Sequence, residues 1–196
     1  MILSINPKNP QQRLINKTCK VLEEGGIIAY PTDTFYGIGC ALYNKKGIEL
    51  IYRLKRRPLS KPFSIICDSL KEISRYAVVS NYAYKTMKRL LPGPYTFILE
   101  GTKLVPRIML TRRKTVGIRV PDNRTCLAIV KTLGRPIIST SAGFDSPHEI
   151  HDAYSSYLDI IIDGGIIKGA PSSVISLIDD VPRIVREGKG DVSCFY

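Results

Sequence analysis

The hydrophobic positions of this chain follow two patterns: apolar residues three or four positions apart, and short continuous apolar runs. The first pattern is typical of amphipathic helices and the second of buried strands. Helices are predicted after the N-cap residues Asn9, Asn44, Ser69 and Ser80, and one more helix is predicted to end at Gly134. Strands are predicted over residues 25–28, 63–67, 95–99, 116–120, 136–139, 159–162, 173–178 and 183–186.

The last three strands are separated only by short turns, Gly164-Gly165 and Asp179-Asp180. We therefore expect them to pair largely without crossover helices, which makes the sheet mixed. Residues 142–156 are polar and mixed in character, and they predict a loop or short helix lying over the ligand site. No repeat or linker interrupts the chain. The prediction is a single α/β (α+β) domain, residues 1–196, with a twisted mixed β-sheet flanked by helices.

The stretch 29–40 follows a buried strand and combines polar side chains with a stiff backbone that contains a proline and two glycines. Thr32, Asp33 and Thr34 stand where the strand ends, and open α/β sheets bind ligands at strand ends. Two hydroxyls and a carboxylate on such a turn predict a grip on a small polar ligand. The same pattern is compatible with Thr32 and Asp33 serving only to cap the turn.

Composition narrows the class of protein. No apolar run approaches the roughly 20 residues of a membrane-spanning helix, and the N-terminus lacks the apolar centre of a signal peptide. The five cysteines are scattered without a C-x-x-C pair, which predicts reduced, mostly buried thiols rather than disulfides or a zinc site. With two histidines, a histidine-rich metal site is excluded. We expect a cytoplasmic protein that does not associate with membranes.

Charge points to anionic ligands. Lysine and arginine number 29 against 17 aspartate and glutamate, which gives a formal net charge of +12. Such a surface attracts polyanions, whether nucleotides or nucleic acid, and net charge alone does not distinguish them.

Polar and cationic residues recur just beyond the predicted strands. They are Thr34, Lys55, Arg57, Lys61, Thr96, Arg119, Ser139, Ser141, Ser173 and Arg186. Arginine forks and lysine charges suit phosphates, and no nucleophile–base pair accompanies them. This combination predicts a site that positions anions and accelerates phosphoryl or nucleotidyl transfer by alignment and charge neutralisation.

Several motifs resemble, in order, those of the YrdC/YciO family and cover nearly the whole chain. They are Tyr30-Pro-Thr-Asp-Thr-Phe-Tyr-Gly-Ile-Gly, Leu54-Lys-Arg-Arg-Pro with Lys61-Pro62, Leu91-Pro-Gly-Pro-Tyr-Thr-Phe-Ile-Leu, Val116-Gly-Ile-Arg-Val-Pro, Ile138-Ser-Thr-Ser-Ala, Pro171-Ser-Ser-Val and Val185-Arg-Glu-Gly. The segments 9–16 and 186–192 resemble the YciO-like branch in particular. The resemblance implies a YrdC-like fold with a large basic concave surface.

The activity implied by the resemblance is that of a nucleotidyltransferase, an L-threonylcarbamoyladenylate synthase. Such an enzyme combines L-threonine, bicarbonate and ATP, releases pyrophosphate, and supplies the tRNA threonylcarbamoyl transferase machinery that modifies the adenosine beside the anticodon. Mg²⁺ is expected to accompany ATP and to be held mainly by its phosphates.

Family position also implies roles for individual residues. Thr34 and Arg119 are expected at the threonine and carbamate end, with Thr96 and Ser173 lining the site. The residues expected to bind the ATP phosphates and nucleotide are Lys55, Arg57, Lys61, Ser139, Ser141 and Arg186.

The sequence departs from the family pattern at two places. Gly143 stands where the motif Ser-Thr-Ser-Ala usually continues with asparagine, and no histidine accompanies the strand that ends at Cys67. The chain ends at Tyr196, from which we expect no second domain of the kind that longer synthases carry.

A binding protein is the competing hypothesis. Members of the family are also described as binding double-stranded RNA or tRNA in the basic concavity. A-form RNA is recognised mainly through its shape and phosphates, contacts that dispersed lysines and arginines can supply. RNA binding through several phosphates weakens steeply with salt, whereas an enzyme pocket shows saturable binding of small ligands and release of pyrophosphate.

Overall fold

The computed structural model describes residues 1–196, which form a ten-stranded sheet with the strand order β1-β8-β2-β3-β7-β4-β6-β5-β9-β10. The strands are β1 (Ile2–Ser4), β2 (Ile28–Tyr30), β3 (Gly37–Gly39), β4 (Ser64–Ile66), β5 (Tyr95–Glu100), β6 (Thr115–Arg119), β7 (Ile137–Ser141), β8 (Ile160–Asp163), β9 (Ser173–Ser176) and β10 (Arg183–Arg186). Parallel and antiparallel pairs both occur, as in β4–β6 and β4–β7, so the prediction of a mixed sheet is confirmed.

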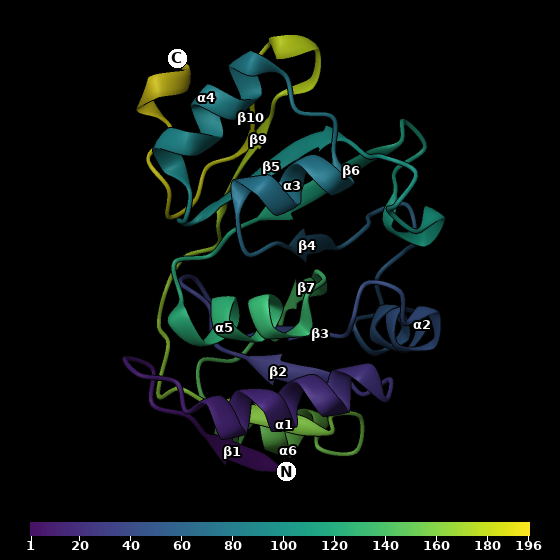
Figure 1. The fold of residues 1–196 in the computed structure, drawn as a ribbon, viewed down its shortest axis with the longest axis vertical. Helices are drawn as coiled ribbons and strands as arrows, with labels where there is room; N and C mark the ends of the chain where they lie inside the picture. Colours follow the sequence, from purple (N-terminus) through teal and green to yellow (C-terminus); the bar gives the residue numbers. More distant parts are fainter.

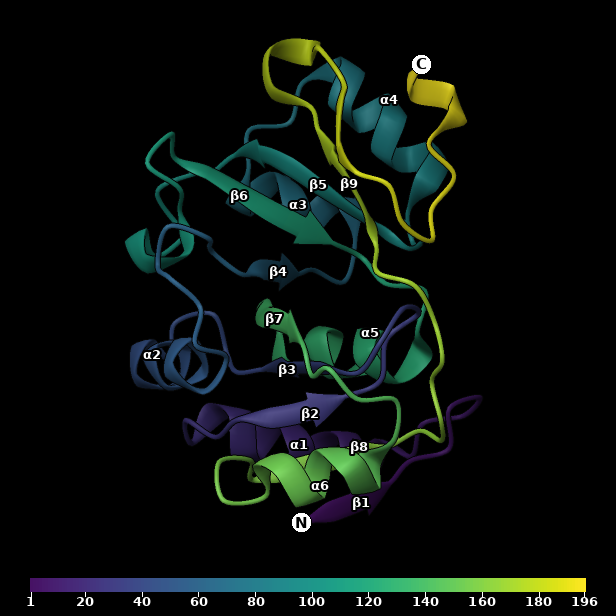
Figure 2. The ribbon, with the colours of Figure 1, turned by 180° about the vertical axis from the view of Figure 1, so that it is seen from behind.

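Six helices flank the sheet (Figure 1). They are α1 (Gln12–Glu23), α2 (Lys45–Leu54), α3 (Leu70–Tyr76), α4 (Asn81–Leu90), α5 (Arg124–Leu133) and α6 (Pro147–Tyr154). Figure 1 shows α1 and α5 over the half of the sheet that contains β2, and α3 and α4 over the half that contains β5 and β6. Figure 2 shows β5, β6 and β9 from the side opposite α3 and α4. None of the helices is both long and apolar enough to cross a membrane.

Apolar side chains on the helix-covered faces of the sheet form two core clusters. The larger one includes Phe97, Ile118 and Ile138, and the smaller one includes Ile15 of α1 and Ile129 of α5. Because side chains alternate across a strand, the neighbours of these core residues on β5 and β6 face the opposite side of the sheet. That opposite face is where polar side chains are free to meet a ligand.

The predicted caps at Asn44, Ser69 and Ser80 are confirmed, because each side chain accepts a hydrogen bond from a backbone N–H in the first turn of its helix. The cap predicted at Asn9 is wrong. Helix α1 begins at Gln12 without a side-chain cap, and the Asn6 side chain instead accepts from the N–H groups of Lys8 and Asn9.

The predicted pairing among the last three strands holds for β9 and β10 and is wrong for β8. Strand β8 pairs in parallel with β1 and β2, whereas β9 pairs with β5 in the other half of the molecule. Gly164 and Gly165 begin a long connection rather than a hairpin. Tyr36 fixes the start of that connection, because its hydroxyl accepts from Gly164 N and donates to Gly165 O.

Residues 142–156 contain α6, which begins with a capping box of Ser146 and Glu149. The helix packs against β8, and its Tyr154 contacts Phe144 edge to face. The prediction that this segment lies over the ligand site is wrong, because none of its residues lines the cavity described below.

The cysteines are unpaired, and all but Cys194 are buried. Burial raises the pKa of the Cys40 thiol to about 12, and it raises that of Cys19 to about 11 with a smaller contribution from Glu23. The prediction of mostly buried thiols is therefore confirmed.

Candidate functional site

A cavity of about 640 Å³ lies on the face of the sheet opposite α3 and α4. Side chains of β5 alternate between the cavity and the core: Thr96 and Ile98 line the cavity, while Phe97 between them belongs to the core. Strand β6 contributes Gly117 and Arg119 in the same way. The volume is within the range of about 300–1,000 Å³ that is usual for small-molecule sites.

The cavity is cationic and rich in hydroxyl groups. Four of its lining residues carry positive charge, Arg57, Lys61, Arg119 and Arg186, and no aspartate or glutamate lines it. The lining serines and threonines are Thr32, Thr34, Ser60, Ser64, Thr96, Thr111, Thr115, Ser139, Thr140, Ser141 and Ser172. Positive charge without lining carboxylates favours an anionic ligand.

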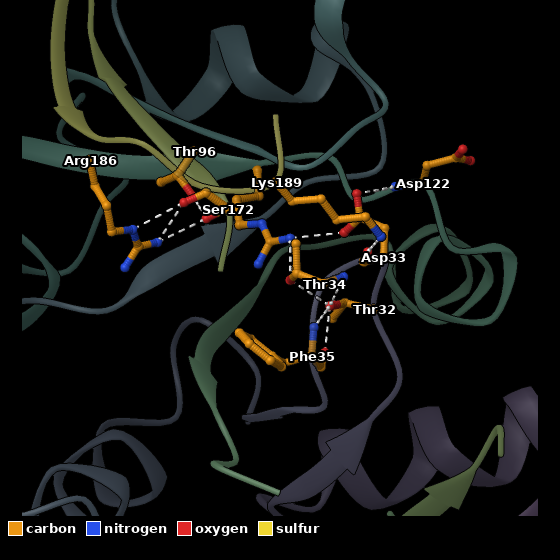
Figure 3. Close-up of polar contacts among 10 residues, drawn as sticks. Thr32, Asp33, Thr34, Phe35, Thr96, Asp122, Ser172, Arg186 and Lys189 are labelled. Atoms are coloured by element: carbon orange, nitrogen blue, oxygen red, sulfur yellow. Dashed lines mark hydrogen bonds and ion pairs between the residues drawn. The ribbon is translucent and has the colours of Figure 1, made fainter. Parts of the chain in front are cut away.

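Arg119 organises one side of the cavity and is only 8% exposed to solvent. Its Nη2 donates to Asp33 Oδ1 at 2.9 Å and to Thr34 Oγ1 at 3.1 Å. Asp33 Oδ2 in turn accepts from the N–H of Asp122 at 3.2 Å, a contact visible in Figure 3. Nε of Arg119 is buried and has no hydrogen-bond partner. A buried donor without a partner is costly. Nη1 also makes no hydrogen bond in the protein and is not fully enclosed, so it is the nitrogen of Arg119 that a ligand can reach.

Thr32 holds the turn that carries Asp33 and Thr34. Its hydroxyl donates to the carbonyl of Phe35 at 2.5 Å and accepts from the N–H groups of Thr34 and Phe35 at 3.1 and 3.2 Å. A hydroxyl has one proton, and the carbonyl of Phe35 takes that of Thr32. Thr34 Oγ1 accepts from Arg119 and lies 3.1 Å from Thr32 Oγ1, so the proton of Thr34 is directed to Thr32.

The interpretation of Thr32 as a turn cap and that of a polar grip are thus both supported, for different residues. Thr32 caps the turn, whereas Arg119, which Asp33 and Thr34 hold, presents a free donor to the cavity.

Arg186 organises the opposite side of the cavity (Figure 3). Its Nε and Nη2 donate to the carbonyl of Ser172 at 3.1 and 2.8 Å, and Nη2 also reaches the Ser172 hydroxyl at 3.2 Å. That hydroxyl lies 2.9 Å from Thr96 Oγ1. Burial lowers the pKa of the Arg186 guanidinium, and the positive charges of Arg119 and Arg57 act in the same direction. An anion between these arginines would relieve their mutual repulsion.

Arg57 is fixed by the loop that follows α2. Its Nε donates to the carbonyl of Lys61 at 2.6 Å, its Nη2 donates to that of Pro62 at 3.2 Å, and its guanidinium lies 5.3 Å from the centre of the Phe63 ring. Arg56, with φ of 46°, reverses the chain between α2 and this loop. The loop therefore presents Arg57 and Lys61 to the cavity together.

Most of the predicted site residues line the cavity. They are Thr34, Arg57, Lys61, Thr96, Arg119, Ser139, Ser141 and Arg186. They come from β5, β6, β7, β10 and the loops after β2 and α2, so the fold brings together residues that are far apart in the sequence.

Lys55 and Ser173 do not line the cavity, contrary to prediction. Lys55 Nζ donates to the carbonyl of Ala142 at 3.0 Å and to the Tyr154 hydroxyl at 3.3 Å. Ser173 pairs with Tyr95 on the core side of β9, and its hydroxyl donates to Gly190 O and accepts from Gly188 N.

Ser172 is the lining serine that the sequence analysis missed, although it belongs to the motif Pro171-Ser-Ser-Val. The residues before β9 alternate between the two faces of the sheet, so an error of one position places a side chain on the wrong face. The adjacent serine pair was the only indication available from the sequence.

This fold and this cavity define a class: single-domain α/β proteins with a mixed sheet and a basic, hydroxyl-lined cavity. The model of the Sua5/YciO/YrdC family, described as "Telomere recombination", matches residues 20–188. This chain belongs to that family.

The chain is 45% identical to the Escherichia coli protein YciO, over 97% of both sequences. The crystal structure of E. coli YciO superposes with a TM-score of 0.95 at 44% identity, covering 100% of this chain and 99% of that one. The predicted resemblance to the YciO-like branch is thereby confirmed.

Relatives named as synthases are more distant. The putative threonylcarbamoyl-AMP synthase of Methanocaldococcus jannaschii is 34% identical, over 95% of this chain and 92% of its own length. The structure of Pyrococcus abyssi Sua5 complexed with L-threonine has a TM-score of 0.89 at 28% identity, and the similarity covers 96% of this chain and 57% of that one.

Proposed function

We propose that this protein is a nucleotidyltransferase that makes L-threonylcarbamoyladenylate from L-threonine, bicarbonate and MgATP. The observation that carries the proposal is a cavity with four cationic lining residues, Arg57, Lys61, Arg119 and Arg186, that no carboxylate lines. Relatives named threonylcarbamoyl-AMP synthase support the reaction, and the threonine complex of P. abyssi Sua5 supports the amino-acid substrate.

The Arg119 side of the cavity suits the carboxylate of threonine. Arginine donates in a fork that matches the two oxygens of a carboxylate, and charge-assisted hydrogen bonds of this kind are about twice as strong as neutral ones. Nη2 is already engaged by Asp33 and Thr34 and Nε is fully buried, so Nη1 is the group of Arg119 that would meet the ligand.

The Arg186 side suits the triphosphate. Arg186 binds Ser172 there, and the charge of Arg57 acts on Arg186. Lys61, Ser139 and Ser141 also line the cavity. Mg²⁺ would enter as part of MgATP and be held by phosphate and water oxygens, because the cavity has no lining carboxylates to bind it.

The proposed reaction has two steps. The amine of threonine adds to the carbon dioxide supplied by bicarbonate and loses a proton, which gives a carbamate. One carbamate oxygen then attacks the α-phosphorus of ATP, the bond from that phosphorus to the bridging oxygen breaks, and pyrophosphate leaves. The cationic residues that line the cavity would hold the carbamate in line with the α-phosphate and neutralise the negative charge that develops during the reaction.

Gly143 is compatible with this function. It has φ of +88°, a conformation that favours glycine, and a Cβ added there would lie 3.7 Å from Lys55 Nζ, which is ordinary contact. The position usual for asparagine therefore adjoins Lys55 and the carbonyl that Lys55 binds, at Ala142.

Binding of double-stranded RNA or tRNA is the second candidate function. Arg112, Arg113 and Lys114 are exposed and lie between Thr111 and Thr115, which line the cavity. A phosphate backbone at this rim would be held by charge alone and would dissociate as salt rises.

The test is release of pyrophosphate with ATP, bicarbonate and Mg²⁺, with and without L-threonine. We expect release that depends on threonine and that falls about tenfold or more in Arg57→Ala, because a charge-assisted phosphate contact is lost. Arg13→Ala is the matched control, since Arg13 is exposed on α1 and does not line the cavity. No release, together with salt-sensitive RNA binding, would support the second candidate instead.

A further inference from the structure

The segment that follows β10, residues 187–191, returns along the edge of the cavity and is packed too closely for larger residues. A Cβ on Gly188 would lie 2.2 Å from the carbonyl oxygen of Pro171, and one on Gly190 would lie 2.4 Å from the Tyr95 ring. Both glycines are therefore required by close approach. They flank Lys189 on either side.

Hydrogen bonds fix this segment at four points. Ser173 Oγ donates to Gly190 O at 2.6 Å and accepts from Gly188 N at 3.0 Å. Lys189 N donates to Pro171 O at 2.7 Å, and the Tyr95 hydroxyl donates to Asp191 O at 3.0 Å. The backbone of Lys189 is consequently held on the half of the molecule that contains β5 and β9.

The side chain of Lys189 reaches across to the other half. Its Nζ donates to the main-chain carbonyl of Asp33 at 2.5 Å, and Figure 3 shows the two residues together. The carboxylate of Asp33 is bound by Arg119 Nη2 and by the N–H of Asp122. Two separate segments, residues 119–122 and the segment that carries Lys189, thus hold Asp33, the residue next to Thr34.

Arg186, the last residue of β10, lies directly before this segment and binds Ser172 in the cavity. Lys189 acts on the other side of the cavity through Asp33. Lys189 itself does not line the cavity.

We propose that Lys189 is a positioning residue for the amino-acid side of the cavity: by holding the carbonyl of Asp33 it fixes the turn through which Asp33 and Thr34 orient Arg119 towards the ligand. The inference rests on the proposed function for the identity of that ligand, L-threonine. A group that only stabilised the fold would affect both ligands, whereas Lys189 is specific to one side.

The experiment compares Lys189→Met, which keeps length and removes the charge, with Lys189→Arg, which can still donate to a carbonyl. Lys85→Met on α4 is the matched control, because Lys85 is exposed and has no side-chain partner. Calorimetric titrations with L-threonine plus bicarbonate and, separately, with MgATP give two dissociation constants for each variant. We expect Lys189→Met to weaken threonine binding about fivefold to tenfold, the effect of one charge-assisted hydrogen bond, and to leave MgATP binding unchanged.

Lys189→Arg should restore most of the threonine affinity, and Lys85→Met should leave it unchanged. Unaltered threonine binding in Lys189→Met, or equal weakening of both ligands, would overturn the proposal.

Hydrogen exchange separates this proposal from the proposed function. In Lys189→Met, the amides of Thr34 and Phe35, which bind Thr32 Oγ1, should exchange faster than in wild type, and in Lys85→Met they should not. If wild-type protein bound no threonine, the proposed function would fail, and the positioning role of Lys189 would be decided by hydrogen exchange alone. Unchanged exchange of the Thr34 and Phe35 amides in Lys189→Met would then overturn the positioning role.

Discussion

The two sides of the cavity differ in how completely the protein itself organises them. On one side, Arg119 is buried, paired with the carboxylate of Asp33 and in contact with Thr34, on a turn that Thr32 holds. On the other side, Arg186 is exposed and is bound only by the carbonyl and hydroxyl of Ser172.

This difference has a physical consequence. A buried, pre-organised donor set loses little entropy on binding and discriminates by geometry, which suits a small ligand such as an amino acid. Exposed cationic side chains without carboxylate partners attract anions over a wider area and can move with the ligand, which suits a flexible triphosphate. The cavity therefore combines a selective side with an adaptable one.

The largest effect is expected from Arg119→Lys. A lysine keeps the charge but lacks the planar fork that fixes Asp33 and a ligand carboxylate in one geometry, so we expect threonine-dependent turnover to fall about 100-fold. The steady-state KM for threonine should rise, while that for ATP should change less than about threefold. Arg13→Lys is the control. Equal losses for both substrates would mean that the two sides do not act separately.

A smaller effect is expected from Arg186→Ala. Loss of one guanidinium from the adaptable side should raise the dissociation constant of MgATP about tenfold, because Arg57 and Lys61 remain. Unlike the effect of Arg119→Lys, this effect should depend on ionic strength. The difference in MgATP dissociation constant between wild type and Arg186→Ala should shrink as salt is added. A difference that does not depend on salt would contradict the picture of an exposed charge.

Ser172 and Ser173 are neighbours on opposite faces, and they should respond differently to alanine. Ser173→Ala removes the hydroxyl that binds Gly188 and Gly190, so thermal denaturation should show a loss of about 1–2 kcal/mol in unfolding free energy. Ser172→Ala should leave stability nearly unchanged and weaken MgATP binding. The reverse result would mean that Ser173, and not Ser172, contacts the ligand, which would contradict the structure.

The smallest effect is expected from Gly143→Asn. The left-handed backbone tolerates asparagine better than other residues, and the added Cβ meets only the end of the Lys55 side chain. We expect a change in MgATP affinity of less than about threefold and a loss of stability below about 1 kcal/mol. Gly143→Ala, which lacks the local hydrogen-bonding side chain, provides the comparison. A tenfold or larger gain of synthase activity in Gly143→Asn would contradict this expectation and show that Gly143 limits the activity of the wild-type protein.

Local features of the fold were predictable because they depend on local physics. The caps at Asn44, Ser69 and Ser80 and the alternation around Arg119 are properties of a few neighbouring residues. Arg119 stood out because a cation alternated with apolar side chains in a strand, which indicated that it faces something other than solvent.

Features that depend on distant contacts were not predictable in this way. Strand β3 reads as a glycine turn, but Gly37 and Gly39 leave room for the Tyr30 ring and the carbonyl of Ile138, contacts that appear only in the folded sheet. The pairing of β8 with β1 and β2, rather than with β9, likewise depends on long-range packing.

The most direct test of the account identifies the product. Purified protein is incubated with L-threonine, MgATP and isotopically labelled bicarbonate, and the mixture is analysed by mass spectrometry. The account predicts threonylcarbamoyl-AMP that carries the label in its carbamoyl carbon and forms only when all three substrates are present. Absence of this product from folded protein that still binds double-stranded RNA in a salt-sensitive manner would contradict it.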